Sequence, residues 1–178
     1  MEGTDDALNR LRSAARDLGR IHDELTARSR ADLTDNYAAE WFLDNYYLVR
    51  AATRQVEQDL PRAFYRKLPR AEGADPGSEP RVHALAIHLA QRSHARLDMG
   101  PVEEEVHAYQ QERPLTMGEL WALPAMLRLV MVELLADSMR RIVGNERSAE
   151  GDQPLAARFG TWPEPVAASD DEQVANCI

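Results

Sequence analysis

The longest apolar stretch of the chain, residues 114–141, limits the folds that the sequence can adopt. Between Met126 and Leu135 only Arg128 and Glu133 are charged. A helix that is apolar nearly all round is buried among other elements, so the sequence predicts a central helix. Because Arg128 and Glu133 lie five positions apart, they do not face each other on a helix. We expect each to meet a neighbouring helix or solvent, and contact with a partner domain is the alternative.

The beginning of this stretch contains two local signals for where a helix starts and ends. Thr116 followed by Glu119 is typical of a capping box, in which the two side chains accept hydrogen bonds from backbone N–H groups at a helix start. Pro124 interrupts the pattern, because proline lacks an N–H and its ring clashes with the preceding turn. The sequence therefore predicts a short helix over about 117–122 that kinks or restarts at Pro124, and a central helix over about 124–143.

Apolar residues recur at helical spacing elsewhere in the chain as well. The predicted helices cover residues 4–30, 34–60, 81–97 and 101–112, with a short helical turn over 61–70. The fold class that follows is all-α: a bundle of about five helices around the central helix, in one domain over residues 1–145. From residue 146 the apolar period stops and acidic residues outnumber basic ones, so we expect residues 146–178 to be a disordered acidic tail.

Composition excludes several classes of function. The net charge is −9, and a nucleic-acid-binding protein would carry a basic surface. The single cysteine, Cys177, cannot form an internal disulfide or a cysteine-based zinc site. The N-terminus lacks the apolar segment of a secretory signal, and the apolar run 120–136 is too short and too interrupted to span a bilayer. We expect a soluble, cytoplasmic protein.

Aromatic residues gather in the segment 34–60. The helical pattern forms one stripe from Tyr37, Trp41, Leu48, Ala52 and Val56, with Ala38, Phe42, Asn45 and Val49 beside it. Aromatic stripes at helical spacing usually pack in cores, because each ring buries a large apolar area. The alternative is a carbohydrate-binding site in which Trp41, Tyr46 and Tyr47 stack on sugar rings.

The sequence contains one cluster of basic residues. Arg62, Arg66, Lys67 and Arg70 follow one another in a short segment. A solvated face is one interpretation, and contact with an acidic protein surface or with phosphate is the other.

Metal-binding patterns are incomplete. Glu104 and His107 form one E-x-x-H motif, whereas a di-iron bundle needs two such motifs and two further glutamates, and the sequence has no second copy. His83, His88 and His94 are spaced by five and six, not by the three or four that a helical metal site requires. A metal-dependent bundle enzyme using Glu104 and His107 is therefore the weakest hypothesis, and we assign no metal ligand, no cofactor and no catalytic residue.

Four blocks occur together in a distinctive order. They are AAEWFLDNYYLV (38–49), DLPRAFYRKLP (59–69), PRVHALAIHLA (80–90) and HAYQQERPLTMGELWALPAMLRLVMVELL (107–135). Residues 34–143 thereby resemble the N-terminal helical region of the cyclic β-1,2-glucan synthases. The resemblance implies a link to UDP-glucose-dependent glucan synthesis, which full-length members perform in the bacterial inner membrane.

The resemblance does not carry the family's chemistry onto this chain. The acidic residues 170–172 do not form the D-x-D pattern that binds a metal–nucleotide complex, and no catalytic residue can be placed. We therefore expect a truncated fragment or stand-alone remnant that acts as a non-catalytic scaffold. Its expected partners are the transferase domain of such a synthase or other protein helices, rather than a small molecule.

Overall fold

The computed structural model describes residues 7–27, 37–71, 78–93 and 97–143. These residues form six helices: α1 (Ala7–Ala27), α3 (Tyr37–Asp59), α4 (Arg62–Tyr65), α5 (Arg81–Arg92), α6 (Met99–Glu112) and α7 (Met117–Val143). Within the same ranges the only β-type pairing is an isolated bridge between Arg70 and Pro80. The predicted all-α class is confirmed. The predicted tail and the domain boundary at residue 145 lie outside the described residues.

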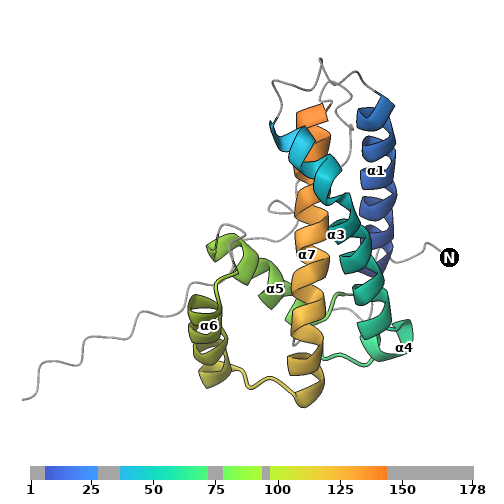
Figure 1. Ribbon diagram of the computed structural model, residues 1–178. Helices are drawn as coiled ribbons and strands as arrows, with labels where there is room; N and C mark the ends of the chain where they lie inside the picture. The colour runs from blue at the N-terminus through green and yellow to red at the C-terminus, as the bar shows by residue number, and fades with distance from the viewer. Residues whose placement is uncertain (1–6, 28–36, 72–77, 94–96, 144–178) are drawn as a thin grey trace, which may run out of the picture.

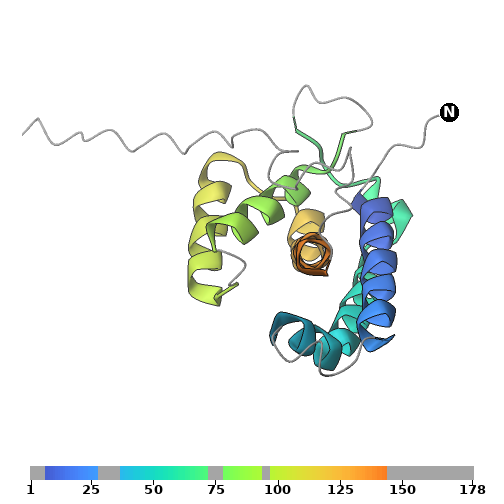
Figure 2. The ribbon, with the colours of Figure 1, turned by 90° about the horizontal axis from the view of Figure 1, so that it is seen from above.

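Helix α7 is the centre of the bundle. Figures 1 and 2 show α1 and α3 along one side of it and α5 on another, and these helices make the main interhelical contacts. The face of α7 that they cover is aliphatic: Ala122, Leu123, Ala125, Met126, Leu129, Val130, Val132, Ala136 and Met139 are buried. The prediction of a central apolar helix is therefore confirmed.

The predicted break at Pro124 was wrong, because α7 continues through this residue as one helix. Pro124 is exposed, so its ring lies on the outer face of the helix, while its neighbours Leu123 and Ala125 are buried. A proline inside a helix costs about 3 kcal/mol. Tertiary packing on both sides of the proline offsets that cost and keeps the two halves in one element.

The capping box at the start of α7 is confirmed. The backbone N–H of Thr116 donates to Glu119 Oε2 (2.8 Å), and the N–H of Glu119 donates to Thr116 Oγ1 (3.3 Å). Arg81 of α5 reinforces it by donating from Nε and Nη2 to the same carboxylate, at 2.6 and 2.8 Å. Burial alone would raise the pKa of Glu119, but the bonds from Arg81 and Thr116 lower it. The cap therefore also ties α5 to α7.

The buried face of α3 differs from the predicted stripe. The core side chains are Ala39, Phe42, Val49 and Val56. Val56 belongs to the first predicted stripe, and Phe42 and Val49 belong to the one beside it. Tyr37, Trp41 and Leu48 are 80%, 46% and 48% exposed. The small side chain of Ala39 lets α3 approach its neighbours closely, whereas Tyr37 and Trp41 project outward.

Helix α6 lies at the edge of the bundle. None of its residues is fully buried, although Val102, Val106 and Tyr109 pack partly against the core. Glu105 joins it to α5 by ion pairs with Arg92 (2.9 Å) and His88 (3.5 Å).

Candidate functional site

A buried polar cluster links α1, α7, α5 and Glu79, which lies just before α5. Arg10 Nε donates to Glu133 Oε1 (3.0 Å) and a second guanidinium nitrogen pairs with Glu79. His83 Nδ1 lies 2.5 Å from Glu79 Oε2, and its side chain is fully buried. Glu133 therefore meets a neighbouring helix, and that prediction is confirmed.

The pKa values of the two carboxyl groups in this cluster are displaced in opposite directions. Burial raises the pKa of Glu133, and the nearby charge of Glu79 adds to the effect, although Arg10 and His83 oppose it. Burial would also raise the pKa of Glu79, but its bonds and charge interactions with His83 and Arg10 outweigh this and hold it at about 2. Because these groups face one another beneath the surface, the cluster serves to hold helices together.

Arg128 also pairs with a neighbouring helix, as predicted. Its Nη1 lies 3.7 Å from Asp59 Oδ2 at the end of α3, and both side chains are partly exposed. Gln55 Nε2 donates to both oxygens of the same carboxylate, at 2.9 and 3.0 Å. Asp59 is thereby fixed in position at the surface.

The three aromatic residues proposed for sugar binding do not share one face. The Tyr46 ring stacks on His22 of α1 at a centroid distance of 4.2 Å and meets Phe42 edge-on at 5.6 Å. Trp41 and Tyr47 are 46% and 65% exposed. At 3.6 residues per turn, positions 41, 46 and 47 point in three different directions, so they do not form a single stacking platform.

The E-x-x-H motif lies on helix α6. His107 Nε2 contacts Gln111 Nε2 at 3.1 Å, and the ion pairs to α5 come from Glu105 rather than from Glu104. In the ranges that the structure covers, no three His, Cys, Asp or Glu side chains are grouped to hold a metal ion. His94 lies outside these ranges.

The basic patch is mostly solvated. Arg62, Arg66 and Lys67 are exposed, and Arg70 is half-buried. Arg62 Nη2 donates to Asn9 Oδ1 of α1 at 2.5 Å, so part of this patch helps to hold α4 against α1.

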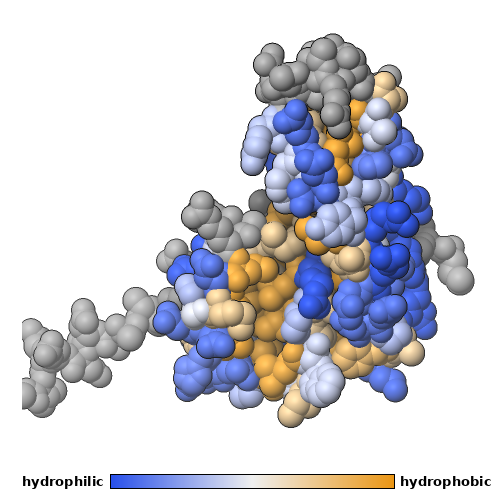
Figure 3. All heavy atoms as spheres, in the orientation of Figure 1, coloured by the Kyte–Doolittle hydropathy of each residue, from blue (hydrophilic) through white to orange (hydrophobic). Residues whose placement is uncertain are grey.

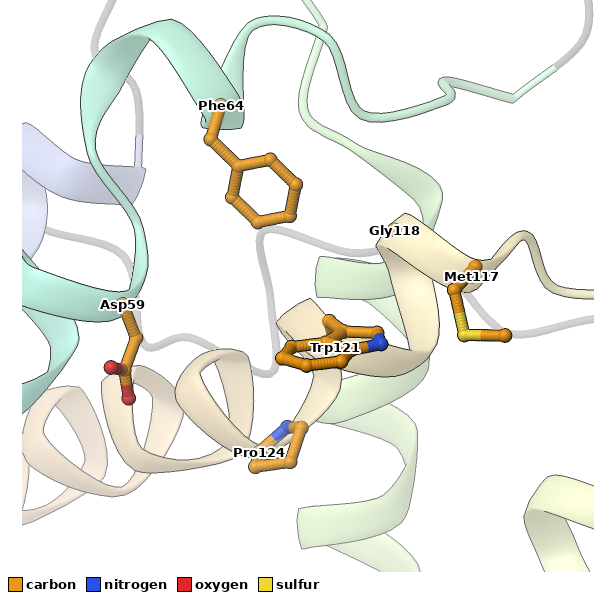
Figure 4. A pocket seen from close by; sticks show the side chains of 6 residues that line it. All are labelled: Asp59, Phe64, Met117, Gly118, Trp121 and Pro124. Atoms are coloured by element: carbon orange, nitrogen blue, oxygen red, sulfur yellow. The ribbon is translucent and has the colours of Figure 1, made fainter.

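An open pocket lies where the first turns of α7 meet the end of α3 and α4. It has a volume of about 420 Å³ and is lined by Asp59, Phe64, Met117, Gly118, Trp121 and Pro124. Figure 4 shows these side chains, with Trp121 between Phe64 and Pro124 and with Asp59 to one side. Trp121 is 76% exposed and Met117 is 70% exposed. Figure 3 shows the main group of apolar side chains over α7 toward α5 and α6, whereas the area toward α3 and α4 mixes hydrophilic and apolar side chains.

Sequence reasoning missed this pocket, because α7 is apolar on nearly all sides. A signal was present: Met117, Trp121, Pro124 and Arg128 follow a helical spacing that places them on one face. That face combines a proline and a charged residue, which are the least suited to a buried helix surface.

Most of this chain is similar to a short segment of a known synthase. It is 35% identical over 133 residues to cyclic beta-(1,2)-glucan synthase NdvB of Rhizobium meliloti (strain 1021). The match covers 75% of this chain but only 4% of the synthase. No family model and no solved structure matches. Among the described helices, none combines the length and the apolar character needed to cross a membrane. The chain is thus related to a small part of the cyclic β-(1,2)-glucan synthases, as its sequence blocks predict.

Proposed function

We propose that this chain is a non-catalytic helical scaffold that serves bacterial glucan biosynthesis by contacting other parts of the synthetic machinery. The observation that carries the proposal is the 35% identity to a segment making up 4% of a glucan synthase. A segment that makes up so small a part of a large enzyme is better suited to a supporting module than to a complete catalytic centre. The charged clusters around Glu133 and Glu119 support the same view, because their groups bind one another and join helices.

The absence of catalysis is tested directly with the isolated chain. Incubation with UDP-[¹⁴C]glucose and Mg²⁺ should release no labelled glucan, whereas the Rhizobium meliloti synthase serves as the positive control. Labelled glucan formed at a rate that rises with the concentration of this chain would refute the proposal.

The supporting role is tested in the synthase itself. Deleting the segment that matches this chain should reduce glucan synthesis, and inserting the 133 matching residues of this chain in its place should restore part of it. Undiminished glucan synthesis after the deletion contradicts a scaffold role.

Glucan binding is a second candidate function. The relative is a glucan synthase, so a β-(1,2)-glucan is the ligand to consider. The observation that favours it is the exposed Trp121 beside a fixed carboxylate, Asp59, in one pocket.

A further inference from the structure

We propose that the pocket at the start of α7 binds a glucose residue of a β-linked glucan, with the Trp121 indole as the stacking surface. This inference rests on the proposed function for its choice of ligand. It moves the sugar-binding surface from the α3 residues Trp41, Tyr46 and Tyr47 to the junction of α3, α4 and α7.

The apolar part of the pocket suits one face of a pyranose ring. Phe64, Met117, Trp121 and Pro124 supply hydrocarbon and aromatic surface, and the Trp121 ring stands largely in solvent. Figure 4 shows that ring between the side chains of Phe64 and Pro124. A pyranose carries C–H groups on its faces, so stacking on the indole would remove apolar area from water on both sides.

The polar part of the pocket suits the hydroxyl groups at the ring edge. Gln55 and Arg128 hold the Asp59 carboxylate, which can accept about four hydrogen bonds and so has capacity left for a ligand. Arg128 is 46% exposed and offers further N–H donors on the same face as Trp121. Pro124 has no N–H, so it cannot donate the usual helical hydrogen bond to the Leu120 carbonyl one turn earlier. Asp59 therefore places hydrogen-bond acceptors at the edge of an apolar floor, and Arg128 pairs with it from the next turn of the same face.

This mixture favours a sugar over a protein helix. An apolar helix lying on Trp121 would cover Asp59 and Arg128 without offering them hydrogen bonds, and such burial is unfavourable. A pyranose that stacks on Trp121 presents hydroxyl groups at its ring edge, where they can bond to these polar side chains. The volume of about 420 Å³ lies in the range of small-molecule sites and exceeds the size of one glucose residue.

The test is a titration of the full chain with β-1,2-linked gluco-oligosaccharides, followed by NMR of the ¹⁵N-labelled tryptophan indoles. We expect the Trp121 signal to shift with a Kd on the order of 1 mM, which is ordinary for a small open site. Trp121→Ala should weaken binding at least ~10-fold, because it removes the stacking surface. Trp41→Ala is the matched control: this tryptophan is also exposed, lies on α3, and its loss should leave the Kd unchanged.

A second pair of variants tests the polar contacts. Asp59→Asn should weaken binding about tenfold, because hydrogen bonds to a charged acceptor are stronger than those to an amide. Asp137→Asn, which changes an α7 carboxylate paired with Arg140, should have no effect.

Three results would overturn the inference. The first is that the Trp121 indole signal does not shift at about 10 mM oligosaccharide. The second is that Trp121→Ala binds the oligosaccharide as well as the wild type does. The third is that the chain self-associates through Trp121 and does not bind sugar. The last result would assign this surface to a protein contact. None of them alters the outcome of the segment-deletion experiment, so the scaffold role is judged separately.

Discussion

Replacing Arg10 by methionine should destabilise the bundle severely. The Arg10 side chain is 12% exposed and neutralises Glu133 and Glu79, which are 5% and 18% exposed. Methionine keeps the apolar stem but leaves two buried carboxyl groups close together without that cation. Removing one partner of a buried ion pair costs about 3–5 kcal/mol.

Arg12→Met is the matched control on the same helix. Arg12 pairs with Glu57 at 3.1 Å, but both side chains are 43% exposed, and such surface pairs contribute about 0–1 kcal/mol. Urea denaturation followed by circular dichroism measures both variants. With an m value of about 2 kcal/mol per M, Arg10→Met should lower the midpoint by about 1.5–2.5 M.

The reasoning fails if Arg10→Met costs no more than Arg12→Met. A double variant adds a second check, because Arg10→Met/Glu133→Met leaves no carboxylate of that pair buried. It should be less destabilised than Arg10→Met alone, since an apolar replacement of a buried pair is often neutral. A double variant worse than the single one would show that Glu133 stabilises the fold by another contact.

Further variants test the same physical account by chemical denaturation. Glu133→Gln should be at least as stable as the wild type at pH 7, because burial raises the Glu133 pKa and its ionised form opposes folding; this advantage should shrink as the pH falls toward 4.5. The Glu79 pKa of about 2 lies below its ordinary 4.5, so the stability that ionised Glu79 contributes is present above pH 4.5 and lost as the pH falls toward 2. Glu79→Gln should therefore lose less stability between pH 4.5 and pH 2 than the wild type does. An equal loss in both proteins would contradict this. Thr116→Ala should cost about 1 kcal/mol through the lost cap, and a cost near zero would contradict the capping role. Phe42→Ala should cost about 3–5 kcal/mol, whereas Trp41→Ala should change stability by less than about 0.5 kcal/mol; equal losses would show that the buried face of α3 is misassigned.

Features fixed by nearby residues were predictable from the sequence. The capping box depends on Thr116 and Glu119, three positions apart, and the structure contains both of its hydrogen bonds. The central role of α7 followed from its apolar composition. In both cases the information lies within one continuous segment of the chain.

Features fixed by distant residues were not predictable in the same way. Glu133 finds its partner in Arg10, 123 positions away, so the sequence could state that a partner was needed but not which one. The α3 stripe was misplaced because several faces of that helix carry apolar residues, and the choice among them depends on how α1 and α7 approach. The Trp121 pocket was missed for the same reason, since only the assembled bundle shows which face of α7 stays uncovered.

The position of α7 in the chain has a consequence for biosynthesis. This helix is the last of the described elements to leave the ribosome, yet α1, α3 and α5 all rest against it. At the usual rates of synthesis, the 116 residues from the end of α1 to the end of α7 take about 6–23 s to be made. During that interval α1 and α3 can cover each other, but the apolar sides of α1, α3 and α5 that face α7 remain exposed. Proteins that bind exposed apolar segments should therefore engage the nascent chain before α7 is made and release it afterwards.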